Sequence, residues 1–380
     1  MVQQEHGSVT YGVIKESNQQ ESRVALTPEI VTRLKKSNIA CVIEQGAGDA
    51  SQFSDDQYEK VGATVVSRDE VFRRANVFGF INRPQDADLA ALPRGSWVVG
   101  MLGSFNDPNY VKRLDQAGLT ALAMEKLPRQ LSSAQSMDEM TSQNSVMGYK
   151  AALLAADSYG SFFPMMTTAA GTIRPAKVLV LGTGIAGLQA IGTAKRLGAI
   201  VTGYDVRPAS QQEVESLGAK FLDLGLDFSK GQGEGGYARQ LTPDEQAQQQ
   251  AAVDSKAAAF DVVITTAKVP GRRPPMLLTK AGVDGLHRGA VIIDCASSEL
   301  GGNVEGSQPG KTVTDNGVTI FGTPDSASGV ATTASNLAAR NLADVVSHFA
   351  SAGGMKFDLS LELDDALVVS GRKEGDGGNE

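Results

Sequence analysis

Three glycines and one acid indicate the chemistry that this chain could support. Gly182, Gly184 and Gly187 follow an apolar run, and Asp205 closes a second apolar run further along. In a strand–turn–helix unit the first glycine permits a tight turn, the second lets the backbone approach a pyrophosphate, and the third lets the helix pack closely on the strand. The free amides of the helix then face the phosphates, and the acid accepts hydrogen bonds from the adenosine ribose. These residues therefore predict a dinucleotide-binding site.

The elements that must position these residues are also present. The apolar run 178–181 suits a strand buried on both faces, a helix-periodic segment closed by Leu197 and Gly198 follows, and residues 200–204 form a second strand. A lone GxGxxG is a weak signal, whereas one inside a complete strand–helix–strand unit with its acid is specific. The alternative is a packing turn that holds no ligand, and the complete unit favours the cofactor site.

The acid also bears on which dinucleotide binds. Asp205, at the end of the second strand, would repel a 2′-phosphate, and this favours NAD(H) over NADP(H). Arg207 is the counter-argument, because a nearby arginine can accommodate that phosphate. The other interpretation of Arg207 is a solvated loop cation. The charge at Asp205 favours NAD(H) as the cofactor.

No histidine is well placed to exchange a proton with a substrate. The chain has His6, His287 and His348, and none is predicted at a strand end facing the cofactor. Hydride exchange between a nicotinamide and a metabolite normally needs such a group. The sequence therefore favours hydride chemistry that needs no acid–base work on a substrate.

A polar loop at residues 128–138 is a second candidate site. Its side chains Arg129, Gln135 and Asp138 could bind the nicotinamide amide and ribose, or the loop could order itself by internal ion pairing. A solvated linker with a helix cap is the third possibility. Spacing alone leaves these alternatives open.

Length and composition narrow the class of protein. A chain of 380 residues is long for one core, which predicts two domains, and 41% hydrophobic with 21% charged residues is typical of a soluble globular protein. The formal net charge of −8 argues against a nucleic-acid surface. Cys41 and Cys295 favour buried thiols in a reducing compartment, and no Cys/His spacing offers a metal site. We find neither a secretion signal nor an apolar run long enough to span a membrane.

Strands that alternate with helices predict the fold. We expect an α/β fold with two Rossmann-like doubly wound domains, joined by long helices at 136–162 and 330–349, with a cleft between them. The first, discontinuous domain is expected at 1–135 plus 345–380. The NAD(H)-binding domain, with its flanking linker helices, is expected at 136–344.

Three further features belong to these domains. Residues 357–369 alternate in character around two acids, which predicts a C-terminal hairpin. Residues 220–224 are expected to form a strand. The glycine-rich stretch 223–243 is expected to form a long loop, and loops of this length in compact domains are usually functional or disordered.

Several motifs together are more specific than the glycine fingerprint. On their account the chain resembles the NAD(H)-binding component (domain I, alpha subunit) of proton-translocating NAD(P) transhydrogenase, and it is more distantly similar to alanine dehydrogenase. The resemblance covers nearly the whole chain. The motifs are Ala134-Gln135-Ser136-Met137-Asp138, Thr168-Ala169-Ala170-Gly171-Thr172, Gly182 to Gly187, Asp205-Val206-Arg207, Gly236-Tyr237-Ala238 and Thr265-Thr266-Ala267.

The resemblance implies roles for residues at matching positions. The loop with Arg129, Gln135, Ser136, Met137 and Asp138 would hold the nicotinamide end and its ribose, and Arg129, Gln135 and Asp138 are the candidate catalytic residues. A glycine-rich segment through Gly236 and Tyr237 would be a mobile loop that closes over NAD(H). The remaining implied cofactor contacts are Gly182, Gly184, Ile185, Gly187, Asp205, Val206, Arg207, Gln249, Ala267 and Lys268.

The chain also departs from the families that it resembles. The loop at 128–138 is one residue longer than is usual, Ser133 stands where the transhydrogenase family has an arginine, and Lys268 replaces an apolar residue. Alanine dehydrogenase needs a lysine and a histidine in its first domain, and the aligned segments 80–84 and 101–104 supply neither. Amino-acid oxidation is therefore the weaker alternative.

The resemblance implies an activity and partners. The chain would transfer hydride directly from NADH to NADP⁺ held by a partner subunit, within an assembly whose membrane-spanning subunits couple this step to proton translocation. It would form a homodimer, bind no nucleic acid, and lie in the cytoplasm on the inner face of the membrane. The alternatives are a stand-alone NAD-dependent amino-acid dehydrogenase and a non-catalytic NAD(H)-binding relative.

Overall fold

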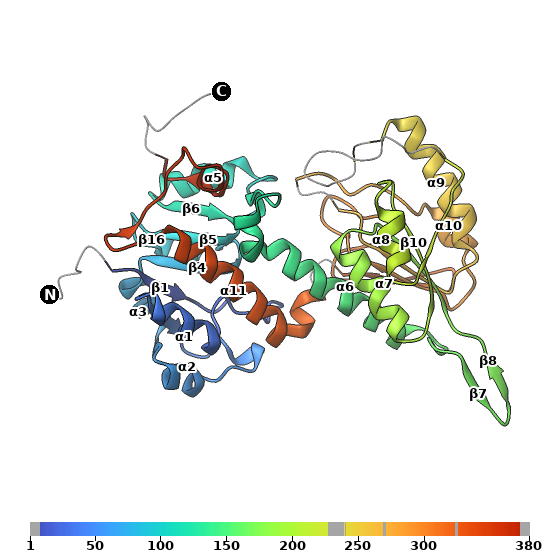
Figure 1. Ribbon diagram of the computed structural model, residues 1–380, viewed down its shortest axis with the longest axis horizontal. Helices are drawn as coiled ribbons and strands as arrows, with labels where there is room; N and C mark the ends of the chain where they lie inside the picture. Colours follow the sequence, from blue (N-terminus) through green and yellow to red (C-terminus); the bar gives the residue numbers. More distant parts are fainter. Residues whose placement is uncertain (1–7, 227–238, 240, 269–270, 324–325, 373–380) are drawn as a thin grey trace. The chain divides into compact units, whose positions relative to one another are not determined.

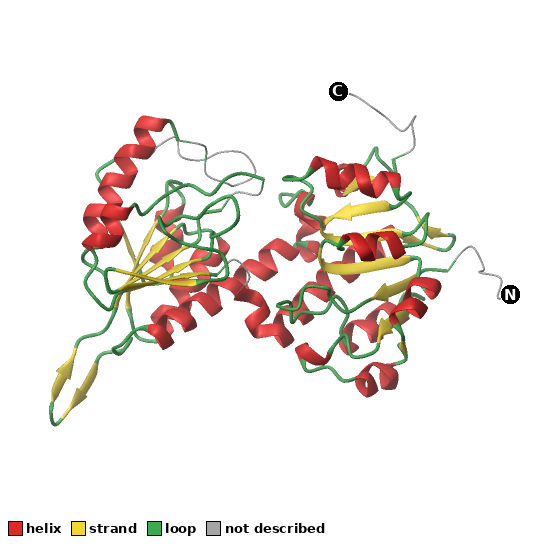
Figure 2. Cartoon of the chain, turned by 180° about the vertical axis from the view of Figure 1, so that it is seen from behind, coloured by secondary structure: helices red, strands yellow, loops and turns green. Residues whose placement is uncertain are grey.

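The chain forms two compact units in the computed structural model, which describes residues 8–226, 239, 241–268, 271–323 and 326–372. The first unit comprises Met1–Gln143 and Val330–Glu380, and the second comprises Asn144–Gly329. Each unit has a sheet with helices on both of its faces (Figures 1 and 2). Within the described residues, none of the helices combines the length and the apolar character needed to cross a lipid bilayer.

The first unit is built on a seven-stranded sheet in which only the edge strand β18 is antiparallel to its neighbour. In spatial order the strands are β18 (Val368–Ser370), β6 (Thr120–Ala123), β5 (Trp97–Met101), β4 (Val77–Asn82), β1 (Thr10–Val13), β2 (Ala40–Glu44) and β3 (Thr64–Val66). The strand order reverses direction between β1 and β4. In open α/β sheets, ligands bind at the carboxyl ends of the strands at such a point.

The strands of this sheet are buried on both faces, which explains their nearly continuous apolar sequences. In β4, Val77 and Ile81 join one hydrophobic cluster, while Phe78 and Phe80 join the other. The first cluster is covered by α1 (Pro28–Lys36) and α11 (Ala331–Phe349), and the second by α3 (Arg68–Arg74) and α5 (Pro108–Gln116). The other helices and short strands are η1 (Asp49–Ser51), α2 (Asp55–Val61), α4 (Asp86–Ala91), η2 (Met124–Lys126), η3 (Ser132–Met137), β16 (Ala350–Ser351), β17 (Gly354–Met355) and α12 (Glu362–Leu367).

The second unit repeats the same strand order around its own first strand. Its strands are β11 (Lys220–Phe221), β10 (Ile200–Tyr204), β9 (Lys177–Leu181), β12 (Val262–Thr265), β13 (Val291–Asp294), β15 (Val318–Gly322) and β14 (Thr312–Asp315), and only β14 is antiparallel to its neighbour. The helices are α6 (Glu139–Ser158), which begins in the first unit, and α7 (Ile185–Arg196), α8 (Ser210–Ser216), α9 (Pro243–Ala257), α10 (Lys280–Gly285) and η5 (Ser326–Val330). The switch point of this sheet lies between β9 and β12.

A short hairpin extends from the second unit. Its strands are β7 (Met166–Thr168) and β8 (Gly171–Ile173), which pair only with each other. In both views the hairpin projects away from the rest of this unit (Figures 1 and 2). Its side chains are largely exposed. The hairpin therefore stands on two strands alone, an arrangement that is marginally stable in water.

The predicted C-terminal hairpin is wrong. Residues Glu362–Leu367 form the helix α12, and β18 returns to pair with β6. Leu363 and Leu367 are four residues apart, so a helix places both side chains in the core, where they are buried. Asp364, predicted in a turn, instead lies in the first turn of α12 and forms an ion pair with His348 at 2.7 Å.

Other elements are shorter than predicted or were not foreseen. The helix expected at 136–162 is α6 (Glu139–Ser158), because the preceding residues form the 3₁₀ turn η3. The strand expected at 220–224 ends at Phe221. The strands β6, β7, β8 and β14 and the helix α10 were not predicted. In the stretch 223–243, the described residues hold no helix or strand before α9 begins at Pro243.

Candidate functional site

The glycine turn between β9 and α7 has the geometry that its sequence predicts. Gly182 has φ +88°, a left-handed conformation that favours glycine. A Cβ atom added to Gly187 would lie 1.9 Å from the carbonyl oxygen of Gly182, so only glycine lets α7 pack this closely. A Cβ on Gly184 would meet nothing within 4 Å, and no side chain caps the start of α7 at Ile185. The exposed edge of the turn and the uncapped amides are therefore open to an anion.

The acid of the motif reaches the turn. Asp205 follows β10, and its Oδ2 accepts hydrogen bonds from the backbone N–H of Thr183 at 2.8 Å and from the Thr183 hydroxyl at 3.4 Å. Its Oδ1 accepts hydrogen bonds from the backbone N–H of Arg207 at 3.0 Å and from the guanidinium Nε at 3.1 Å. The acid therefore joins the end of β10 to the turn after β9.

Arg207 is bound to the same acid rather than solvated. Its Nη2 donates to Asp205 Oδ2 at 3.2 Å and to the carbonyl oxygen of Thr183 at 3.1 Å. Burial lowers the pKa of the guanidinium, but pairing with Asp205 outweighs this effect and raises its pKa, so the pair is ionic. Val206, between them, is half-buried.

The segment after β12 lies against the glycine turn. The Thr266 hydroxyl donates to the carbonyl oxygen of Gly182 at 2.8 Å, and a Cβ on Gly182 would lie 2.8 Å from the backbone nitrogen of Ala267. Lys268 follows with an exposed side chain. Of the implied cofactor contacts, Ala267 therefore lies beside the turn and Lys268 comes directly after it.

The other implied cofactor contacts have different surroundings. Gln249 on α9 is 3% exposed, and its amide donates to the Tyr204 hydroxyl at 3.1 Å, so it supports β10 from within the unit. Gly236 and Tyr237 lie outside the described residues. Gln249 is therefore not brought to the open side of the turn.

The polar loop at 128–138 belongs to the first unit and is ordered by an internal ion pair. Arg129 Nε donates to Asp138 Oδ2 at 2.8 Å, and its Nη2 donates to the Thr141 hydroxyl at 2.6 Å. Asp138 Oδ1 also accepts the backbone N–H of Thr141 at 2.8 Å at the start of α6. Gln135 and Ser136 are exposed, whereas Met137 is buried. The loop therefore presents Gln135 and Ser136 on a fixed frame.

Buried acids lie directly beside this loop. Glu139, the first residue of α6, is 1% exposed, and among the described residues neither of its carboxylate oxygens has a hydrogen-bond partner. Burial raises its pKa to about 8, a trend opposed by Arg23 and reinforced by Glu125, Glu16 and Glu21. Arg23 is held by Glu21 through Nε at 2.8 Å and Nη2 at 2.6 Å. Glu139 therefore lies in a place that favours its neutral, protonated form.

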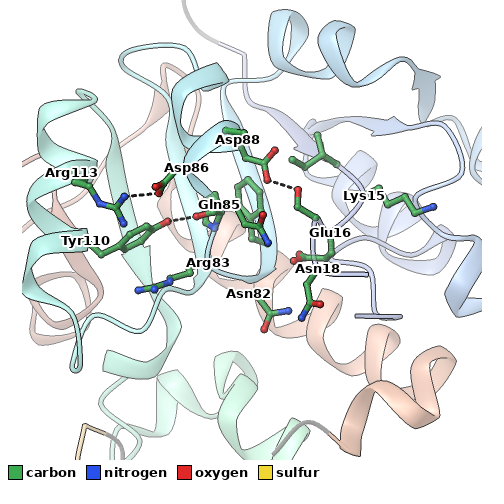
Figure 3. Close-up of a pocket in the computed structure, with 15 residues that line it drawn as sticks. Lys15, Glu16, Asn18, Asn82, Arg83, Gln85, Asp86, Asp88, Tyr110 and Arg113 are labelled. Carbon is green, nitrogen blue, oxygen red and sulfur yellow. Dashed lines mark hydrogen bonds and ion pairs between the residues drawn. The ribbon is translucent and has the colours of Figure 1, made fainter. Parts of the chain in front are cut away.

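A pocket of about 610 Å³ lies at the switch point of the first unit (Figure 3). No glycine turn follows β1, and the next helix begins only at Pro28, so the pocket lacks the phosphate-binding features of the second unit. Arg83 and Arg113 contact the ring of Tyr110, with 4.9 and 5.1 Å to its centroid. Its lining residues are Ile14, Lys15, Glu16, Ser17, Asn18, Phe80, Asn82, Arg83, Pro84, Gln85, Asp86, Ala87, Asp88, Tyr110 and Arg113.

Sequence reasoning missed some of these residues. Thr183 and Thr141 are ordinary polar residues in sequence, and only the fold shows that they hold Asp205 and Asp138. The pocket of the first unit draws its lining from separate segments, so no single motif indicates it. A threonine inside the glycine turn and a threonine three residues after a capping acid are the signals that could have been used.

The fold and the glycine turn define the class: an α/β protein with two Rossmann-like domains, one of which carries a dinucleotide-type turn. Residues 12–147 match the family "Alanine dehydrogenase/PNT, N-terminal domain", and residues 151–372 match "Alanine dehydrogenase/PNT, C-terminal domain". The chain therefore belongs to the alanine dehydrogenase/PNT family, as its motifs suggested.

Individual relatives narrow the likeness. The chain is 40% identical over 366 residues to the first of the polypeptides that make up the NAD(P) transhydrogenase alpha subunit of Rickettsia prowazekii, covering 94% of each chain. A solved transhydrogenase from Sinorhizobium meliloti has a TM-score of 0.85 at 37% identity, covering 95% of this chain and 98% of that one. A solved L-alanine dehydrogenase has a TM-score of 0.75 at 26% identity, with 94% and 93% covered. The expected two-domain Rossmann-like fold is confirmed.

Proposed function

We propose that the chain is the NAD(H)-binding alpha subunit of a proton-translocating NAD(P) transhydrogenase. In this role it binds NADH and passes hydride directly to NADP⁺ on a partner subunit. The observation that carries the proposal is the glycine turn held to Asp205 through Thr183, in a chain 40% identical to a transhydrogenase alpha subunit over nearly its full length. The family match agrees with NAD(H) as the cofactor.

The arrangement of Asp205 and Arg207 supports NAD(H) rather than NADP(H). Arg207 donates to both oxygens of Asp205, so it is already committed to that carboxylate. To bind a 2′-phosphate the guanidinium would have to leave Asp205, which would expose an acid to a second negative charge. The pair therefore favours a ribose with free hydroxyls.

The histidines support a reaction without proton transfer to a metabolite. His287 pairs with Asp261 at 3.1 Å, and Asp261 also accepts the backbone N–H of Lys177 at the start of β9, so the pair lies at the amino edge of the sheet. His348 pairs with Asp364 in the first unit. His6 lies outside the described residues. Direct transfer between two nicotinamides needs no such group, and holding the rings in contact in a dry site supplies the rate.

The loop at 128–138 is the proposed nicotinamide-end site. Arg129 and Asp138 form its ion-paired frame, and Gln135 stands exposed on it. We assign Gln135 to the nicotinamide amide and Asp138 to the neighbouring ribose, with Arg129 orienting Asp138. This frame is fixed by hydrogen bonds before any ligand binds, which lowers the cost of ordering it.

The partners follow from the same proposal. The chain works with an NADP(H)-binding subunit and membrane-spanning subunits, lies in the cytoplasm against the inner face of the membrane, and forms a homodimer. The hairpin β7–β8 supports the dimer, because it stands on two strands alone near exposed apolar side chains. These are Phe162 (43% exposed), Met165 (66%) and Ile173 (39%).

The stand-alone amino-acid dehydrogenase is less well supported. Binding a carboxylic acid would need an available cation in the first unit, and the buried Arg23 is already occupied by Glu21 and Gln143. The non-catalytic NAD(H)-binding relative draws its support from the altered loop, where Ser133 replaces an arginine of the transhydrogenase family.

Reconstitution with an NADP(H)-binding transhydrogenase subunit tests these functions together. The proposal expects NADH to bind the chain alone and hydride to pass to NADP⁺ only in the mixture. NADH binding without exchange would favour the non-catalytic relative. Turnover of amino acids with NAD⁺ by the chain alone would establish the dehydrogenase instead.

A further inference from the structure

A buried asparagine holds the backbone of the segment that faces the glycine turn. Asn303 is fully buried, and its side-chain Nδ2 donates to the carbonyl oxygens of Ala267 at 2.9 Å and Pro275 at 2.7 Å. Its Oδ1 accepts the backbone N–H of Ala267 at 2.9 Å. One amide group therefore binds both polar atoms of the Ala267 backbone and closes the loop that runs on to Pro275.

Asn303 is itself held by the end of the neighbouring strand. Its backbone N–H donates to Asp294 Oδ2 at 3.2 Å, and Asp294 Oδ1 accepts the hydroxyl of Thr265 at 2.9 Å. A Cβ on Gly302 would lie 2.2 Å from Asp294 Oδ2, so glycine is needed before Asn303. The carboxyl ends of β12 and β13 are therefore joined by one buried polar network.

This network determines what the segment presents to the turn. Because both backbone polar atoms of Ala267 are bound by Asn303, they are not available to a ligand. The Ala267 methyl group would lie 3.1 Å from a Cβ on Gly182, so it is the methyl that faces the turn. Lys268, with its exposed side chain, follows in the direction that this peptide sets.

We infer that Asn303 is a positioning residue for dinucleotide binding, which acts by holding Ala267 and Lys268 in the orientation that the cofactor requires. The inference rests on the proposed NAD(H) site and adds a residue that touches no ligand. If Asn303 only filled the interior, its loss would lower stability and leave the affinity for NADH unchanged. If it positions the segment, affinity falls beyond what the loss of stability explains.

The test compares two buried polar side chains at opposite edges of the same sheet. Asn303→Ala removes the network at the carboxyl edge, and Asp261→Ala removes a buried acid that is 2% exposed at the amino edge. NADH dissociation constants are measured by fluorescence titration well below the melting temperature of each variant. We expect Asn303→Ala to weaken NADH binding roughly tenfold or more, because buried polar groups of the loop lose their partners. Asp261→Ala is expected to lower the melting temperature while changing NADH affinity less than about twofold.

The outcomes separate the inference from the proposed function. Failure of the wild-type chain to bind NADH would remove the proposed function, whereas unchanged NADH affinity in Asn303→Ala would remove only the role of Asn303. Amide hydrogen exchange of the wild-type chain adds a test that does not depend on a variant folding. The Ala267 amide is expected to exchange slowly because it is bound to Asn303. Rapid exchange at Ala267 in the folded chain would overturn the inference.

Discussion

At the scale of single residues, the glycines of the turn differ in the space around them. Gly187 lies against backbone, since an added Cβ would come within 1.9 Å of the Gly182 carbonyl oxygen, which cannot move without disturbing β9. Gly184 faces open space. The first position is fixed by packing within the protein, and the second by what the proposed cofactor needs.

These surroundings predict opposite effects for the same substitution. Gly187→Ala is expected to lower the melting temperature of the chain strongly, because overpacking against backbone costs about 1–3 kcal/mol or more. Gly184→Ala is expected to keep the melting temperature and weaken NADH binding, because its methyl group stands where the pyrophosphate approaches. Thermal unfolding and NADH titration of both variants check this. A stable Gly184→Ala variant with unaltered affinity would contradict the placement of the phosphates.

Residues that act through a motif could be predicted from sequence, and residues that act through the fold could not. Asp205 is predictable because its distance from the glycines is set by one helix and one strand. Thr183 and Asn303 are not, because their partners depend on how the turn and the ends of β10, β12 and β13 come together. Gln249 is an expected cofactor contact from the resemblance, but α9 turns it inward to Tyr204.

At the scale of elements, the start of α6 combines an ordered polar loop with a buried acid. Asp138 caps the helix and is held by Arg129, while the next residue, Glu139, is buried without a hydrogen-bond partner among the described residues. The groups that influence Glu139 lie on other elements: Tyr11 on β1, Glu125 on η2, and Glu16, Glu21 and Arg23 in the segment between β1 and α1. Ionisation of Glu139 would therefore place another negative charge among acids.

The raised pKa of Glu139 predicts a specific dependence of stability on pH. In the unfolded chain the carboxyl loses its proton near its ordinary value of 4.5, whereas the folded chain retains it up to about 8. The folded state therefore binds more protons than the unfolded state in this window, and stability falls as pH rises through it. Burial also raises the pKa of Glu16, to about 7, which acts in the same direction.

Substitution of Glu139 isolates its share of this effect. Glu139→Gln keeps the shape and stays neutral, so its melting temperature is expected to depend less on pH, and by pH 8.5 to exceed that of the wild type on the order of 5 °C. The control is Glu59→Gln at an exposed position of α2, which is expected to follow the wild-type profile. Thermal unfolding between pH 5 and 9 makes the comparison. Parallel profiles for wild type and Glu139→Gln would show that Glu139 does not retain its proton.

Elements with a strong local pattern could be predicted closely, and those that depend on distant partners could not. The predicted strands 40–44, 64–66 and 97–101 match β2, β3 and β5. The C-terminal residues differ from their prediction, because alternation around Asp364 and Asp365 is also compatible with a short helix. Burial of Leu363 and Leu367 in the first core and the pair between His348 and Asp364 favour the helix.

At the scale of the whole molecule, the hairpin β7–β8 is the clearest feature that the single chain leaves unsupported. Replacing residues 166–173 with a glycine–serine linker is expected to convert the proposed dimer into a monomer, because this removes the hairpin, including its exposed Ile173. Light scattering after gel filtration measures the mass. Leu361→Ser is the control, because Leu361 is 50% exposed in the first unit and is expected not to matter for assembly. A wild-type monomer at tens of micromolar, or a dimeric linker variant, would contradict the proposed homodimer.

The order in which the two units are interleaved along the chain affects how the protein is made. The second unit is one continuous segment, Asn144–Gly329, whereas the first unit needs both Met1–Gln143 and Val330–Glu380. During synthesis on a ribosome the second unit can complete its sheet while the first still lacks α11 and β18. The first unit must therefore wait, with the surface that α11 will cover still exposed, until the last fifty or so residues have emerged. Chaperone dependence during translation is expected to fall on this half of the protein.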